Sequence, residues 1–197
     1  MRQETLEVYK FNELASEVQE KVIEKNRNWN VEYQGWADHL LDDWKCQLEE
    51  IGFEDVEIYY SGFWNQGDGA CFETKCFDFE KLVKHLDCKK YRHLLTIVDY
   101  LSGAIEKNSY SNHYSHEKTR YVSIDLNNHR ETPLLEKLVN EFEEDLETLR
   151  KNLSHQIYKQ LTTEYMYLTS DDAVKESIEC NEMEFFEDGT IFDTFRI

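Results

Sequence analysis

The sequence predicts an α+β fold in which several helices pack on a small antiparallel sheet. Hydrophobic residues recur every three or four positions over long stretches, which is the period of a helix buried on one side. Shorter stretches alternate apolar and polar residues, as strands do. The 197 residues include 1 proline and 7 glycines, so long helices are favoured over a many-turned all-β sandwich.

The composition supports one folded domain over residues 1–197. Hydrophobic residues make up 40% of the chain and aromatic residues 14%, which is enough for a core and unlike a disordered chain. The length is typical of one domain, and no proline- or glycine-rich linker divides it. A long helix expected over 133–161 is free to protrude from this domain.

Two helices are expected first. Ser16, with Gln19 three residues later, matches a capping box and predicts a helix over 16–29. Tryptophan and leucine residues then recur every four positions, which predicts a second helix over 32–51 with Gly52 as its C-cap.

A hairpin over 55–77 follows, because the period changes from about 3.6 to two. Its strands are expected at 55–64 and 70–77. In the loop between them, Gly67 and Gly69 flank Asp68, and we expect both glycines to supply the positive φ of a tight turn. Phe63 or Trp64 is expected to pack on the helix over 32–51.

The middle of the chain predicts two helices and a strand. Asp78 is a suitable N-cap for a short helix. Apolar residues spaced three or four apart predict another helix near 89–107, and alternation predicts a strand over 119–126.

The longest helix is expected over 133–161, opened by Pro133. Its leucine stripe continues for about seven turns, or about 40 Å, before a break near Thr162 or Leu168. Ser170 then caps a final helix, and a terminal hairpin is expected over 183–195.

The charge balance excludes some functions. The chain has 22 Lys and Arg against 41 Asp and Glu, a net charge of −19. Broad contact with nucleic acid is disfavoured, because phosphate contacts need basic patches; anionic membranes are disfavoured for the same reason. No apolar stretch is long enough for a membrane span, the first residues lack the pattern of a secretory signal, and the 5 cysteines form no CxxC pair. We expect a cytoplasmic protein with reduced thiols.

Clustered acids predict a partner-binding surface. Carboxylates along a rigid helix can imitate nucleic-acid phosphates and occupy a basic groove. A merely solvated surface of an acidic protein explains the same pattern. The candidate residues are Asp42, Asp43, Glu49, Glu50, Glu136, Glu143, Glu144 and Glu147.

The hairpin motif is the main rival site. Its loop lacks the Lys-Ser/Thr of a P-loop and the ladder of acids of an EF-hand. We therefore interpret the loop as structural. The alternative is that its aromatic and amide side chains hold a nucleotide or another small ligand. The motif residues are Phe63, Trp64, Gln66, Gly67, Asp68 and Gly69.

Other chemistry is weakly indicated. Cys71 beside Phe72 on a strand is more typical of a core residue than of a nucleophile. His113, His116 and His129 form the one histidine cluster, in a polar context that favours a solvated loop over a metal site. We therefore expect no catalytic residue, metal or cofactor. A third alternative is an accessory protein that assembles with itself through the leucine stripe.

Three stretches carry a resemblance: Tyr9-Lys10-Phe11-Asn12-Glu13-Leu14, the string from Ser61 to Phe72, and Tyr167 to Val174. With them the sequence resembles a family of small acidic proteins encoded by phages and prophages. The resemblance covers both ends of the chain and leaves about 85–160 without a matching motif. It implies a phage setting, in which an acidic, non-catalytic protein is expected to inhibit a host defence system.

These observations lead to one functional hypothesis. We expect a phage-encoded counter-defence inhibitor, similar to anti-CRISPR proteins, that acts in the host cytoplasm. Its partner would be a host defence protein with a basic groove, such as a CRISPR effector nuclease, bound by acidic DNA mimicry.

Overall fold

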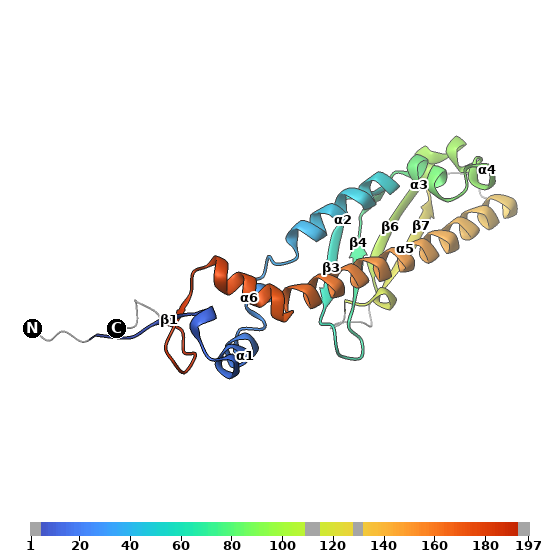
Figure 1. Cartoon of the computed structure of the whole chain (residues 1–197). Coiled ribbons are helices and arrows are strands. Elements are labelled where there is room, and N and C mark those ends of the chain that lie inside the picture. The colour runs from blue at the N-terminus through green and yellow to red at the C-terminus, as the bar shows by residue number, and fades with distance from the viewer. Residues whose placement is uncertain (1–4, 109–114, 128–131, 193–197) are drawn as a thin grey trace, which may run out of the picture. The chain divides into compact units, whose positions relative to one another are not determined.

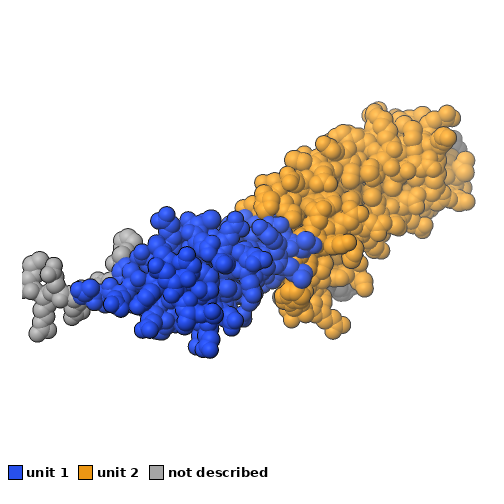
Figure 2. Space-filling model, in the orientation of Figure 1, with its two compact units in different colours: residues 1–37, 163–197 blue, residues 38–162 orange. Residues whose placement is uncertain are grey.

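A computed structural model describes residues 5–108, 115–127 and 132–192. It confirms the α+β class, with small antiparallel sheets packed by several helices (Figure 1). By internal contacts the chain divides into two compact units, which Figure 2 distinguishes. Unit 1 comprises Met1–Ala37 and Thr163–Ile197, and unit 2 comprises Asp38–Thr162. That both belong to one domain stays a prediction.

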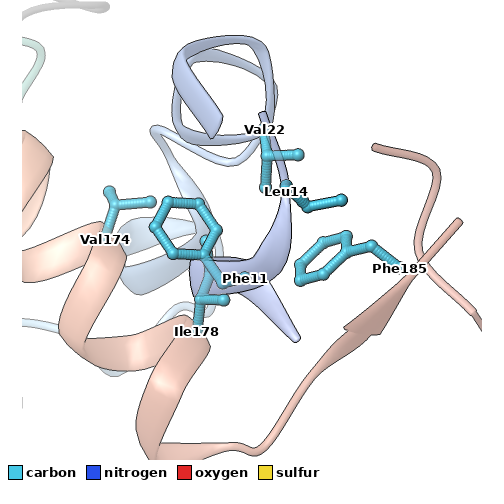
Figure 3. Packing of buried hydrophobic residues seen from close by; sticks show 6 residues of the cluster. All are labelled: Phe11, Leu14, Val22, Val174, Ile178 and Phe185. Carbon is cyan, nitrogen blue, oxygen red and sulfur yellow. The ribbon is translucent and has the colours of Figure 1, made fainter. Parts of the chain in front are cut away.

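Unit 1 joins the two ends of the chain. Strands β1 (Tyr9–Lys10) and β8 (Glu184–Phe185) pair antiparallel, and helices α1 (Ser16–Lys25) and α6 (Asp171–Cys180) cover them. Side chains from α1, α6, β8 and the 3₁₀ turn Phe11–Glu13 with the following Leu14 make one apolar core (Figure 3), comprising Phe11, Leu14, Val22, Val174, Ile178 and Phe185.

The helix near the N-terminus begins where predicted but is not capped as predicted. Ala15 is the N-cap, and the Gln19 side chain donates to the Leu14 carbonyl at 2.9 Å. The helix ends at Lys25 rather than at 29. At this end the backbone N–H and the side-chain amide of Asn26 both donate to the Val22 carbonyl, at 3.1 Å and 2.7 Å.

Unit 2 contains the remaining elements. Its helices are α2 (Asp38–Ile51), α3 (Phe79–Leu86), α4 (Cys88–Tyr91) and α5 (Pro133–Leu168), whose last turns belong to unit 1. Its strands are β2 (Phe53–Glu54), β3 (Glu57–Ser61), β4 (Gly69–Glu73), β5 (Cys76–Phe77), β6 (Leu101–Lys107) and β7 (Arg120–Leu126). Single 3₁₀ turns lie at Phe11–Glu13 and Trp29–Val31 in unit 1 and, in unit 2, at Leu94–Thr96, Val98–Tyr100 and Glu117–Thr119.

The second helix is shorter than expected, since α2 starts at Asp38 instead of 32. Its C-terminal prediction is confirmed: Gly52 adopts φ +120° and its N–H donates to the Leu48 carbonyl at 3.1 Å. Asp78 also caps α3 as expected, accepting from the Lys81 N–H at 3.0 Å.

The predicted hairpin over 55–77 is bent into two pairs. In β3–β4 Tyr59 lies opposite Cys71, and in β2–β5 Phe53 lies opposite Phe77. Between the pairs Asp55 adopts φ +52°, and the Thr74 hydroxyl bonds to the carbonyl of Cys76 at 2.9 Å. Strand β3 ends at Ser61 rather than at 64.

The helix predicted near 89–107 is wrong. Only Cys88–Tyr91 is α-helical there, two 3₁₀ turns follow, and Leu101–Lys107 is strand β6. This strand pairs with β7 along its whole length, with Ile105 opposite Val122. Pairing with a distant segment therefore overrides a local spacing that is also compatible with a helix.

Helix α5 extends past the predicted 133–161 and ends at Leu168, which is the second of the two positions where a break was expected. In unit 2 it runs beside the strands (Figure 1). The stripe residues buried there are Leu135, Phe142, Leu146, Leu153, Ile157 and Leu161. These stripe residues therefore pack inside the chain, and the self-assembly alternative stays untested.

The C-terminal segment matches the prediction in part. Ser170 caps α6 by accepting from the Ala173 N–H at 3.3 Å. A turn reverses the chain after β8, with Gly189 at φ +83°, and Phe185 bridges to Ile191. Residues 193–195 of the predicted hairpin lie outside the described residues. Within the described part of the chain, no helix is long and apolar enough to cross a membrane.

Candidate functional site

One side of α2 presents a row of carboxylates, here called the α2 acidic face. All four predicted residues are exposed: Asp42, Asp43, Glu49 and Glu50. Trp44 and Leu48 on the other side of the helix are buried. Lys45 forms one exposed ion pair with Asp42 at 3.3 Å. The α2 acidic face is therefore accessible to a partner.

The four predicted carboxylates of α5 are not equivalent. Glu136 and Glu144 are exposed, whereas Glu143 and Glu147 are half-buried. Burial is the largest influence on Glu143 and raises the pKa of its carboxyl, and the charges of Asp125, Glu147 and Glu144 raise it further. Glu143 thus lies in a repulsive environment that a basic partner would relieve.

Glu147 is held by contacts within unit 2. The fully buried Arg150 donates to its two carboxylate oxygens from Nη2 at 2.6 Å and from Nε at 2.9 Å. The same carboxylate accepts from the Val122 N–H at 3.2 Å and pairs with Lys151 at 3.1 Å. Burial raises the pKa of Glu147, but the bonds and charge of Arg150 outweigh it and lower the pKa overall. Glu147 is thus held by contacts inside unit 2, and a partner-binding role for it stays a prediction.

A groove of about 780 Å³ in unit 2 continues the acidic surface. It lies at the bend between the two strand pairs and against β6. We call it the acidic groove, because five carboxylates and two ammonium groups line it: Glu49, Asp55, Glu57, Glu73, Glu106, Lys75 and Lys107. Glu49 also belongs to the α2 acidic face, so helix and groove share one acidic surface.

Two groove carboxylates are fixed by neighbours. Glu73 pairs at 2.6 Å with Arg120, whose side chain is 4% exposed. The guanidinium of Arg120 lies 5.4 Å from the ring centroid of Tyr59, and the Tyr59 hydroxyl donates to Glu57. That hydrogen bond, with burial second, raises the pKa of Tyr59 to about 12. The groove wall is thus pre-organised around a buried arginine.

Cys71 has the surroundings of a core residue. Its side chain is buried, and the Thr119 hydroxyl lies 3.9 Å from Sγ. Burial raises the pKa of the Cys71 thiol, and the nearby Arg120 offsets this only in part. Because the thiolate is the nucleophile, a raised pKa opposes a nucleophilic role.

The hairpin loop uses Asp68 to hold its own backbone. Oδ2 of Asp68 accepts from the N–H groups of Trp64 at 2.9 Å and Asn65 at 2.7 Å. Trp64 is 71% exposed, and Gln66 is also exposed. A carboxylate that closes the loop in this way is less available to a ligand, which weakens the rival site.

Phe63 packs against two tyrosines. Its ring stacks on Tyr60 at 6.3 Å and on Tyr158 of α5 at 5.9 Å, while packing of Phe63 or Trp64 on α2 stays a prediction. The aromatic stack therefore attaches the hairpin to α5.

The two loop glycines serve different purposes. Gly67 adopts φ +97°, as the turn prediction requires. Gly69 is not among the positive-φ residues, so that part of the prediction is wrong. A β-carbon on Gly69 would instead lie 2.9 Å from Cδ2 of His116, and close packing explains the glycine.

The histidine cluster is described only at His116, since His113 and His129 lie outside the described residues. Nδ1 of His116 accepts from the Lys118 N–H at 3.2 Å. Among residues 5–108, 115–127 and 132–192, no three His, Cys, Asp or Glu side chains are placed to hold a metal ion.

Sequence reasoning missed Arg120, Arg150 and the acidic groove. A signal for Arg150 was present, because it lies four residues after Leu146 and three before Leu153, within the apolar stripe. A charge in such a stripe indicates a buried ion pair. Glu147 lies three residues before Arg150, which is a spacing at which side chains on a helix meet. The groove had no such signal, since it forms where distant strands meet.

Comparison with known proteins adds one relationship. No curated protein and no solved structure matches the chain. The family described as a domain of unknown function, DUF8835, matches residues 36–171. The match spans all of unit 2, including the α2 acidic face and the acidic groove. The chain therefore belongs to the DUF8835 family.

Proposed function

We propose that unit 2 binds a basic, nucleic-acid-binding surface of a partner protein and blocks it. The observation that carries this proposal is the continuity of exposed carboxylates from the α2 acidic face into the acidic groove through Glu49. Complementary charge of this kind speeds association and selects basic partners.

The spacing of the carboxylates suits phosphate mimicry. Asp42 and Glu49 lie seven residues apart on one side of α2, a rise of about 10 Å. Measured along the duplex axis, that rise equals about three nucleotide steps of one DNA strand. Glu136 and Glu143 repeat the same interval on α5.

The setting follows from the phage-like motifs. We propose a counter-defence inhibitor, similar to anti-CRISPR proteins, that acts in the host cytoplasm on a defence nuclease. The net charge of −19 supports a partner with a basic groove. No catalytic residue or cofactor is part of this proposal.

Displacement of DNA tests the proposal. Labelled duplex DNA is bound to each of a panel of purified bacterial defence nucleases, including CRISPR effector complexes, and the chain is titrated in. We expect displacement from at least one nuclease, weakening steeply as salt rises because screening acts on exposed charges. Failure across the panel, or displacement insensitive to salt, contradicts the proposal.

Charge reversal locates the surface. Asp43→Lys with Glu50→Lys reverses two exposed charges of α2, and we expect a slower association rate. Glu17→Lys with Glu20→Lys makes the same change of charge on exposed positions of α1. Equal effects of the two pairs would show that net charge alone acts and that the α2 acidic face is not the contact.

A further inference from the structure

Unit 1 carries an aromatic pocket that the proposed function does not use. Its volume is about 460 Å³, within the range of small-molecule sites, about 300–1,000 Å³. Three rings line it: Trp29, which is 40% exposed, Tyr33, which is 60% exposed, and Tyr167, which is 58% exposed. Single exposed aromatics are ordinary, but three around one cavity indicate a binding surface.

Two polar side chains of the pocket, Ser177 and Asn30, bond to each other and to the backbone. The Ser177 hydroxyl donates to Oδ1 of Asn30 at 2.8 Å, and Nδ2 of Asn30 donates to the Leu168 carbonyl at 3.0 Å. These side chains have little hydrogen-bonding capacity left for a ligand. A ligand that needs hydrogen bonds from Ser177 and Asn30 is therefore a poor match.

The charge of the pocket is negative. Among the described residues that line it, Glu176 is the only charged one, and it is exposed. The chain's own cations stack elsewhere in the described structure, Lys90 on Tyr91 and Arg120 on Tyr59. Within residues 5–108, 115–127 and 132–192, no cation lies over the faces of the three pocket rings.

We propose that this pocket binds a methylated ammonium group. Such a cation is attracted by aromatic faces and by a carboxylate, and a quaternary nitrogen has no N–H that needs an acceptor. The volume also admits the chain that carries the ammonium group. The ligand is either a small quaternary amine or a methylated lysine of a protein, since both present the same chemistry.

The proposal is independent of the acidic surface of unit 2. Of the lining residues, Tyr167 and Leu168 fall within the segment matched by the DUF8835 family, and the others lie outside it. Ligand binding here would therefore be a property that unit 1 adds to the family domain.

A pair of isosteric ligands provides the first test. Choline and its neutral carbon analogue, 3,3-dimethylbutan-1-ol, are titrated into the full chain and followed by calorimetry and by the indole N–H resonance of Trp29. We expect choline to bind at least about fivefold more tightly, because only the cation gains the electrostatic attraction. Equal affinity, or no binding of choline at millimolar concentration, overturns the proposal.

A peptide pair distinguishes the two sources of ligand. A short peptide with one trimethyllysine is compared with the same peptide carrying unmodified lysine. Tighter binding of the methylated peptide than of choline assigns the pocket to a protein partner, and the reverse order assigns it to a small amine. A preference for unmodified lysine contradicts the proposal.

Variants place the binding in this pocket. Trp29→Ala and Tyr33→Ala are each expected to weaken choline binding at least about fivefold, and Glu176→Gln to weaken it less. Trp64→Ala removes a more exposed tryptophan in unit 2 and is the matched control, with no expected effect. Circular dichroism checks folding, and the two ring variants keep the test valid if one misfolds. Loss of choline binding in Trp64→Ala, but not in the two ring variants, would place the site outside this pocket and overturn the proposal.

Discussion

Arg150 and Glu147, one turn apart on α5, form a two-point ion pair in which the guanidinium is fully buried. The third contact of Arg150, from Nη1 to the Glu117 carbonyl at 2.8 Å, connects α5 to the turn before β7. A carboxylate from the most acidic part of the helix is thereby used to hold the fold.

Removing one partner of this pair should destabilise unit 2. We expect Arg150→Ala to cost about 3–5 kcal/mol in the free energy of unfolding by urea, because it leaves a buried cavity and removes the buried partner of the Glu147 carboxylate. Lys151→Ala, which removes an exposed partner of the same carboxylate, should cost about 0–1 kcal/mol. Replacing both charges, as Arg150→Met with Glu147→Met, should cost less than Arg150→Ala; a larger loss would show that the charges themselves are needed.

Glu143→Gln should stabilise the protein. Burial and three neighbouring carboxylates raise the pKa of Glu143, so its ionised form is disfavoured in the fold. We expect a higher melting temperature at neutral pH, with a gain that shrinks as salt rises. Glu144→Gln, at the exposed neighbouring position, is the control and should change less. A lower melting temperature for Glu143→Gln would reveal a favourable partner for the carboxylate.

Gly103→Ala should disrupt the packing of β6. The new β-carbon would lie 2.3 Å from Cδ2 of Phe77 and 3.2 Å from Phe79, and such overpacking typically costs about 1–3 kcal/mol. Ala104→Ser, at the next position, should stay within about 0.5 kcal/mol. Adding Phe77→Leu should recover part of the loss in urea unfolding; strict additivity of the two changes would refute the contact.

The loop carboxylate can be tested with two substitutions. Asp68→Ala removes the acceptor of two backbone N–H groups and should cost about 1 kcal/mol, with faster amide exchange at Trp64 and Asn65. Asp68→Asn retains an acceptor oxygen and should fold normally and keep partner binding. An Asp68→Asn protein that is thermally unchanged but inactive would move the functional site to the hairpin.

Two tyrosines should titrate late in the folded protein. The pKa values of Tyr59 and Tyr91 are raised from 10.0 to about 12, through a hydrogen bond to Glu57 for the first and burial for the second. Because the folded-state pKa values are raised, folding favours the neutral form of both tyrosines. The stability that the two tyrosines contribute is therefore complete below pH 10 and is lost as pH rises through about 12. Ultraviolet titration should show both late groups, Tyr91→Phe should remove one, and the urea-unfolded chain should show neither. Full ionisation of the tyrosines near pH 10 in the folded state would contradict the Tyr59–Glu57 hydrogen bond and the burial of Tyr91.

Local sequence signals accounted for much of the fold. Gly52, Asp78 and Ser170 end or begin helices as expected, because a cap depends on a few adjacent residues. The β3–β4 pair followed from alternation and the turn at Gly67. The exposed carboxylates of α2 were equally predictable, since helical period separates Trp44 and Leu48 from the acids.

The sequence by itself determined the α+β class, the caps, the long apolar stripe of α5 and the acidic side of α2, because each is encoded by neighbours within a turn or a strand. Only the tertiary structure decided that Leu101–Lys107 is a strand, that Glu147 is paired with Arg150, and that the bent hairpin and β6 enclose an acidic groove. Those outcomes depend on contacts between segments far apart in the chain, where packing and pairing energies override local preference.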